Sequence, residues 1–147
     1  DVLRYAEKIP LLGAPGKTFS YSNISASLAG YLAVIAQKNK HKSDFMSLNL
    51  YQGYKELLQQ KVLNPIGMKT ATLQASSAQE SSNYGKSYKF KNGLAIEAES
   101  EDFDDDPLAP SGALKANILE MADYIRMQLN YGKSSKGIQI VSNVNFG

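Results

Sequence analysis

The sequence contains no cysteine, no tryptophan and a single histidine, His41. The absence of cysteine excludes disulfide bonds, thiolate metal sites and a cysteine nucleophile. A single histidine excludes a zinc site built from several histidines and leaves one candidate for a histidine base. No apolar run approaches the roughly 18 residues that a membrane-spanning helix needs. Since the chain has neither cysteine nor several histidines, we expect no metal site, and we expect no other cofactor.

The chain as a whole also lacks an excess of charge of one sign. It has 16 Lys and Arg residues against 14 Asp and Glu residues, which gives a formal net charge of +2. A protein that binds nucleic acid needs a strongly basic face, so this balance argues against a nucleic-acid partner.

The acids are unevenly distributed, because residues 97–106 contain half of them. Two hypotheses remain for this segment. A solvated acidic loop is the simpler one. A calcium loop is the other, since Asp102, Asp104 and Asp106 have the alternating spacing of one. The glycine and the glutamate that such a loop requires at its sixth and twelfth positions are absent.

The composition is that of a globular protein, with 43% apolar and 20% charged residues. At this length one domain is the default, so we expect a single domain over residues 1–147. The hydrophobic periodicity predicts helices over residues 1–9, 24–35, 50–63 and 117–129. The residue before a proline avoids the helical region, so Asn64-Pro65 is expected to end the third of these helices.

Two helices carry clear start signals and apolar faces. Ser22 and Asn23 are good N-cap residues, and Asn117 with Glu120 has the form of a capping box. The apolar face of the second helix is predicted to contain Ile24, Leu28, Tyr31, Leu32 and Ile35. That of the last helix is predicted to contain Ile118, Met121, Ala122, Ile125 and Leu129.

The segments between the helices have fewer signals. Residues 84–96 alternate on either side of Asn92-Gly93, which predicts a β-hairpin. Residues 74–83 and 107–112 are predicted to be loops, because they are rich in small polar residues or in proline and glycine. The expected fold class is thus mainly α with a small β-hairpin.

Three segments resemble a known family in the same order along the chain. Residues 15–23 read PGKTFSYSN, residues 64–72 read NPIGMKTAT, and residues 109–122 begin APSGALK and end EMA. They resemble the serine β-lactamase and penicillin-binding-protein superfamily, in the branch of class C β-lactamases, D-alanyl-D-alanine carboxypeptidases and related esterases. The resemblance covers roughly residues 1–132 and implies the helical subdomain of that superfamily's α+β fold.

The Tyr-Ser-Asn triplet at residues 21–23 matches one of the three motifs of this superfamily. The resemblance implies that Tyr21 is the catalytic residue that carries a proton between the serine and the leaving group. It implies that Asn23 binds the amide or carbonyl of the substrate. The residue types suit these roles, because the positive end of a helix dipole favours a deprotonated oxygen and an amide offers both a donor and an acceptor. The structural alternative is that Tyr21 packs and Asn23 only caps the helix.

The loop around Ser111 and Gly112 matches a segment that lines the rim of the cleft in the superfamily. The resemblance implies that both residues contact the substrate. The substrate is expected to be a small molecule or a peptidoglycan-type peptide. The structural alternative is an ordinary turn before the last helix.

Two of the superfamily's three motifs are missing. No serine stands three positions before a lysine, and no Lys-Thr-Gly occurs. Because these motifs are missing and the first residue is Asp1 rather than methionine, we expect the chain to be part of a larger serine hydrolase. We expect this part to be inactive alone. The resemblance implies that the remaining α/β domain of the larger protein packs against it. The alternative is a non-catalytic binding or scaffold member of the same family. The resemblance also implies an extracytoplasmic location.

Overall fold

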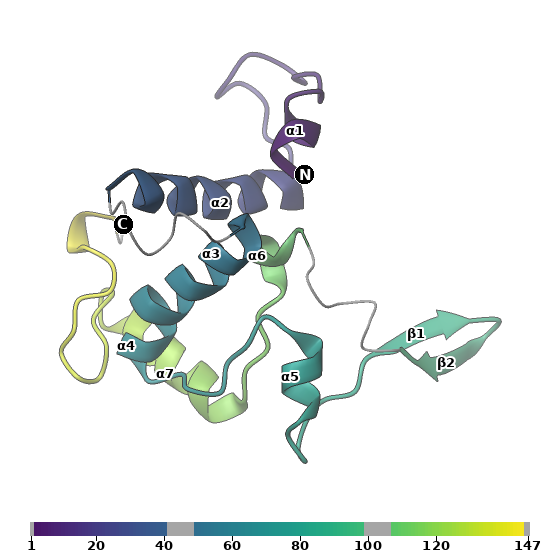
Figure 1. Ribbon diagram of the computed structural model, residues 1–147, viewed down its shortest axis with the longest axis vertical. Coiled ribbons are helices and arrows are strands. Elements are labelled where there is room, and N and C mark those ends of the chain that lie inside the picture. The colour runs from purple at the N-terminus through teal and green to yellow at the C-terminus, as the bar shows by residue number, and fades with distance from the viewer. Residues whose placement is uncertain (1, 41–48, 99–106, 146–147) are drawn as a thin grey trace. The chain divides into compact units, whose positions relative to one another are not determined.

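The computed structural model describes residues 2–40, 49–98 and 107–145. Helices dominate these residues, and a two-stranded antiparallel sheet accompanies them, so the predicted fold class is confirmed (Figure 1). The chain forms two compact units. The first lies within residues 1–56 and 106–113, and the second within 57–105 and 114–147. None of the described helices is long and apolar enough to cross a lipid bilayer.

The first unit is built on one long helix. It contains α1 (Val2–Ala6), α2 (Asn23–Lys40), most of α3 (Leu50–Leu58) and α6 (Ala109–Gly112). Both α1 and α6 contact α2. The predicted N-cap of α2 is confirmed, because the Ser22 hydroxyl oxygen accepts a hydrogen bond from the Ser25 amide at 3.4 Å.

The buried face of α2 differs from the predicted one. Ser27, Tyr31 and Val34 are buried, whereas Leu32 is exposed and Ile24, Leu28 and Ile35 are only half-buried. The buried residues are spaced i, i+4 and i+7, so the periodicity is helical but the face is rotated. It is rotated because the neighbouring α6 segment presents backbone carbonyl groups, which need hydroxyl donors as well as apolar contacts.

Close packing joins α2 to α3 inside this unit. The rings of Tyr31 and Tyr54 meet edge to face, with centroids 6.3 Å apart and planes at 77°. This geometry is favourable for aromatic pairs. Burial of the Tyr54 phenol raises its pKa above the ordinary value, since a phenolate would lose hydration. A Cβ atom at Gly53 would lie 2.5 Å from a Val34 methyl group, so glycine is needed for this approach.

In the second unit the helix that begins as α3 does not end before Pro65. It continues as a π-helical segment, η1 (Gln59–Leu63), and then as α4 (Asn64–Ile66). The sequence-based prediction was wrong here for a specific reason. The Asn64 amide bonds to the Gln59 carbonyl five residues back, and this wider turn accommodates a proline that has no N–H. Gly67, at φ 108°, ends the helix instead.

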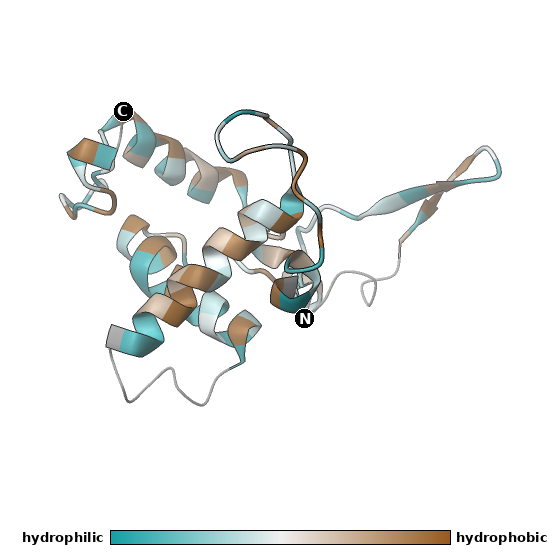
Figure 2. Cartoon of the chain, turned by 90° about the horizontal axis from the view of Figure 1, so that it is seen from above, coloured by the Kyte–Doolittle hydropathy of each residue, from teal (hydrophilic) through white to brown (hydrophobic). Residues whose placement is uncertain are grey.

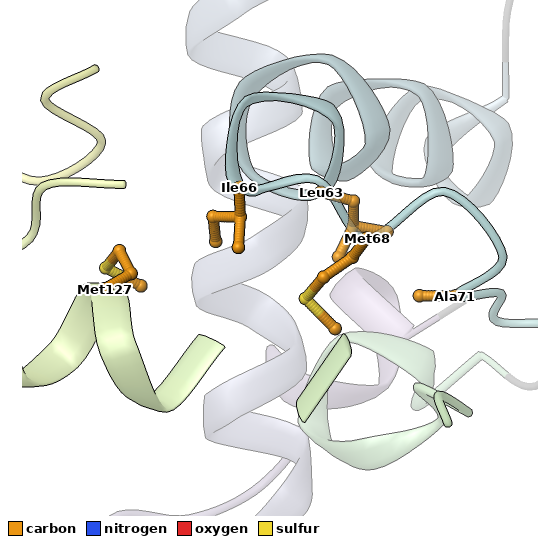
Figure 3. Packing of buried hydrophobic residues seen from close by; sticks show 5 residues of the cluster. All are labelled: Leu63, Ile66, Met68, Ala71 and Met127. Carbon is orange, nitrogen blue, oxygen red and sulfur yellow. The ribbon is translucent and has the colours of Figure 1, made fainter. Parts of the chain in front are cut away.

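The core of the second unit gathers around the end of α4. Its buried members are Leu63, Ile66, Met68, Ala71 and Met127 (Figure 3). Met127 comes from α7 (Ile118–Leu129), which contacts α4. The two methionines suit an irregular core, because their flexible side chains fill gaps that branched residues leave.

Helix α7 starts where the sequence predicts, but its capping differs. The Asn117 side-chain oxygen accepts hydrogen bonds from the amides of Leu119 and Glu120, at 3.0 and 2.9 Å. The Glu120 carboxylate does not complete a capping box. It turns instead to Thr70, where it accepts from the backbone N–H at 2.7 Å and from the hydroxyl at 2.9 Å. Glu120 therefore ties α7 to the segment after α4.

The apolar stripe predicted for α7 is not the buried face of this helix. Ile118, Ile125 and Leu129 are exposed, and the buried residues are Glu120 and Met127. The sequence pattern identified an amphipathic helix correctly, but the described residues of the unit bury a different side of it.

The remaining elements of the second unit are short. The predicted hairpin is confirmed as β1 (Tyr88–Lys91) and β2 (Leu94–Glu97), with Tyr88 opposite Glu97. Asn92 and Gly93 have φ values of 52° and 80°, as a tight hairpin turn requires. Both strands are exposed and carry apolar as well as polar residues (Figure 2).

Lys86, just before β1, pairs with the Glu97 carboxylate at 2.8 Å. This hydrogen bond raises the pKa of Lys86.

Three short helices lie where no regular structure was predicted. They are α5 (Ala75–Gln79), α6, and the 3₁₀ turn η3 (Asn143–Asn145). Segments 74–83 and 107–112 are therefore not loops throughout. Buried Ala75 and Ala109 each anchor one helical turn, and a single turn has too short a pattern to be recognised from periodicity.

Candidate active site

Tyr21 lies in the irregular segment that leads into α2. Residues 18–22 form no strand, and α2 begins at Asn23. The tyrosine side chain is 82% exposed, so its hydroxyl is open to solvent and to any ligand beside it. The packing alternative for Tyr21 would require a buried ring, which the described residues do not provide.

Asn23 is the first residue of α2 and is exposed. The capping hydrogen bond at this helix start comes from Ser22. The side-chain amide of Asn23 therefore has a donor and an acceptor at the helix N-terminus, where the backbone N–H groups also point outward. Such an arrangement suits a peptide-like group that carries both a C=O and an N–H.

Ser111 and Gly112 belong to α6, the single turn after Leu108. The Ser111 hydroxyl donates to the Leu108 carbonyl at 2.7 Å and is half-buried. Its proton is therefore used within the loop, and what it offers a ligand is its oxygen as an acceptor. Gly112 is exposed, and a Cβ atom there would meet nothing within 4 Å. Both residues can thus border a ligand, Gly112 through its backbone.

The structure places all four predicted site residues in one compact unit. Tyr21 and Asn23 mark the start of α2, and α6 packs against the same helix. The packing is at Ser27 and Gly30, which lie one to two turns from Asn23, about 6 to 10 Å along the helix axis. The α6 turn is therefore attached to α2 one to two helical turns from the residue that begins this helix.

Sequence reasoning missed the residues that hold α6 in place. Ser27 was not singled out, and Tyr31 was assigned only to an apolar face. The available signal was the helical spacing of Ser27, Gly30 and Tyr31, a stripe of small and hydroxyl-bearing residues within an otherwise apolar segment.

Within the part of the chain that the structure describes, no group of three His, Cys, Asp or Glu side chains could hold a metal ion. The calcium hypothesis concerns Asp102, Asp104 and Asp106, and these residues lie outside the described ranges, as does His41.

Comparison with protein families defines the class of this chain, that of serine-hydrolase-type proteins. The chain matches the family described as Beta-lactamase over residues 1–141. It therefore belongs to the β-lactamase family, a family of hydrolases. A search of curated proteins finds no match.

Proposed function

We propose that this chain is the helical part of a penicillin-recognising serine hydrolase. The branch we propose is that of class C β-lactamases, D-alanyl-D-alanine carboxypeptidases and related esterases. Its substrate is a β-lactam, a peptidoglycan-type D-Ala-D-Ala peptide or a small ester. One observation carries this proposal. In a chain of the β-lactamase family, the Tyr-Ser-Asn triplet stands at the start of α2 with Tyr21 and Asn23 both exposed.

The proposed reaction proceeds through an acyl-enzyme. A serine oxygen attacks the substrate carbonyl carbon, and its proton passes to a base. The amide or ester bond then breaks, and the leaving group takes that proton. Water finally hydrolyses the acyl-serine. Tyr21 is the proposed proton carrier, and Asn23 is proposed to hold the substrate amide. Ser111 and Gly112 are proposed to contact the substrate at the rim of the cleft.

The nucleophile is proposed to come from further polypeptide. The sequence has no Ser-x-x-Lys and no Lys-Thr-Gly, so it cannot supply the serine motif or the strand motif of the superfamily. The exposed stripe of α7, formed by Ile118, Ile125 and Leu129, supports a partner domain, because apolar stripes of this kind mark packing surfaces. We propose that the α/β domain of the larger protein covers it.

The missing motifs also favour a second candidate, a non-catalytic binding or scaffold member of the family. Such a member keeps the helical unit and lacks the nucleophile. The two candidates differ in the larger protein, where the enzyme has a Ser-x-x-Lys segment and the scaffold does not. An extracytoplasmic location is part of the first proposal, because enzymes of this branch act on the cell wall or on antibiotics directed at it.

The deciding experiment is intact-mass analysis of the larger protein after incubation with benzylpenicillin. We expect a mass increase equal to one penicillin molecule, since opening the lactam ring releases no fragment. The adduct is expected to disappear when the serine of the Ser-x-x-Lys segment is replaced by alanine. No adduct and no turnover of lactams or esters would contradict the enzyme and support the scaffold.

Tyr21→Phe tests the role of the tyrosine within that enzyme. It removes only the hydroxyl of an exposed ring, so we expect turnover to fall by about 10²- to 10⁴-fold, the usual contribution of acid–base catalysis. Tyr88→Phe on the exposed hairpin is the matched control and is expected to change turnover less than twofold. Unchanged turnover in Tyr21→Phe would refute the assigned role.

A further inference from the structure

Two buried hydroxyl groups of α2 hold the chain that leads into α6. The Tyr31 hydroxyl donates to the Pro107 carbonyl at 2.7 Å, and the Ser27 hydroxyl donates to the Leu108 carbonyl at 3.1 Å. Both bonds join segments that are more than 75 residues apart in sequence. The two acceptors are consecutive in the chain, and the two donors lie one turn apart on α2. The bonds therefore fix both the distance and the orientation of this segment relative to α2.

The burial of these donors makes the bonds costly to break. Ser27 is 0% exposed and Tyr31 is 3% exposed, so neither residue is open to bulk solvent as an alternative partner. A buried hydroxyl without a partner costs free energy, which penalises any displacement of the loop that breaks these bonds. The Leu108 carbonyl also accepts from the Ser111 hydroxyl and the Ser111 amide, at 2.7 and 2.9 Å. The same oxygen therefore links α2 to the residue predicted to contact substrate.

Sterics set the distance between the two elements. A Cβ atom at residue 30 would lie 2.5 Å from the Pro110 Cβ, so only glycine permits the observed approach. Ala109 is buried in the same packing. The α6 turn is thus held by two hydroxyl groups and by a close contact at Gly30.

This attachment bears on the start of α2. Asn23 and Ser27 are spaced i, i+4, so they share a face of the helix and lie about 6 Å apart along its axis. Asn23 therefore stands on the side of α2 to which the Leu108 carbonyl is bonded. Because both residues belong to one continuous helix, the position of Asn23 relative to Ser27 is fixed.

We propose that Ser27 and Tyr31 are positioning residues that fix where the Ser111–Gly112 turn lies relative to Asn23, and so determine how well large substrates bind. The proposal rests on the proposed function, because it assumes that Asn23 and this turn both contact a bound lactam, peptide or ester. It assigns no chemical step to either hydroxyl. It predicts that their loss affects binding of large substrates and leaves small ones unaffected.

The test uses Ser27→Ala and Tyr31→Phe in the larger protein, with two reporter substrates. A chromogenic cephalosporin with a bulky acyl side chain is expected to contact the turn, and p-nitrophenyl acetate is expected to be too small to do so. We expect KM for the cephalosporin to rise about three- to tenfold, the equivalent of one lost hydrogen bond. KM for the acetate is expected to change less than twofold, and kcat for the acetate is expected to stay constant.

Ser25→Ala is the matched control, since Ser25 is an exposed serine on the same helix. A second readout does not need activity. In the 147-residue chain, the Ser111 amide donates to the Leu108 carbonyl and the Ala113 amide to the Ala109 carbonyl. Hydrogen exchange of both amides is expected to accelerate in both variants, because the α6 turn is then held less firmly. In the second unit, the amides of Thr72 and Lys115 each donate to the carbonyl of the other residue, and their exchange rates should not change.

The outcomes separate the two proposals. An active wild-type protein with equal KM changes for both substrates, or with none, overturns the positioning role and leaves the proposed function standing. A wild-type protein that forms no acyl-enzyme overturns the proposed function and the positioning role together. If Ser27→Ala fails to fold, Tyr31→Phe decides the question, because it keeps the ring that packs against Tyr54.

Discussion

At Gly30 the absence of one carbon atom allows two segments distant in sequence to meet. The surrounding contacts are ring atoms of Pro110 and the ring edge of Tyr54, and none of these can turn aside as a flexible side chain can. Residues of this kind carry no chemistry of their own. They determine where the neighbouring chemical groups lie, as Ser27 and Tyr31 do through their hydroxyl groups.

Gly30→Ala is expected to destabilise the chain by up to about 2 kcal/mol. Alanine gains about 1 kcal/mol of helix propensity over glycine, but overpacking against Pro110 costs about 1 to 3 kcal/mol. Gly112→Ala is the matched control, because its Cβ meets nothing within 4 Å. We expect it to be neutral or slightly stabilising. Urea unfolding of both variants measures the difference, and equal midpoints would show that Gly30 is not a close-contact position.

At the scale of elements, local signals predicted starts and turns better than ends and faces. Asn92-Gly93 produced the hairpin, and Asn117 and Ser22 each supply a cap, because the interactions involved span only a few residues. Pro65 failed as a stop signal, since a π-helical turn accommodates it. The buried faces of α2 and α7 were misplaced, because burial depends on partner segments that periodicity does not contain.

Asn117→Ala tests the cap of α7. We expect a loss of about 1 kcal/mol of stability, because the amides of Leu119 and Glu120 lose their acceptor. Asn117→Asp is the matched control, since its carboxylate keeps the acceptor at the helix N-terminus, where a negative charge is favourable, and removes the donation to the Thr70 hydroxyl. Thermal unfolding by circular dichroism compares the two. Equal losses for both variants would assign the effect to the Thr70 contact rather than to the cap.

At the scale of the whole molecule, the described residues leave large apolar side chains uncovered in both units. Leu12 and Phe19 are exposed in the first unit, and Ile118 and Leu129, at 81% and 77%, are exposed in the second. Single exposed apolar residues are ordinary, but a stripe along one helix is a surface that packs against something. This stripe is the surface that we propose to be covered by the α/β domain of the larger protein, which would also carry the two missing motifs.

The stripe predicts self-association of the 147-residue chain when it is produced alone. Sedimentation velocity at micromolar concentrations is expected to show dimers or larger species. The double variant Ile125→Lys, Leu129→Lys should be monomeric, because two charges on the stripe oppose its burial. Leu94→Lys on the exposed hairpin is the control and should associate like the wild type. Unchanged association in the double variant would place the contact elsewhere.

The sequence by itself determined the fold class, the hairpin, the caps and the family, because these depend on short-range chemistry and on ordered motifs. It also directed attention to Tyr21 and Asn23, whose exposure at the start of α2 the structure describes. Only the tertiary structure decided which side of each helix is buried. It alone brought Ser27 and Tyr31 to the carbonyls of Pro107 and Leu108, because contacts across more than 75 residues depend on how the chain folds back on itself.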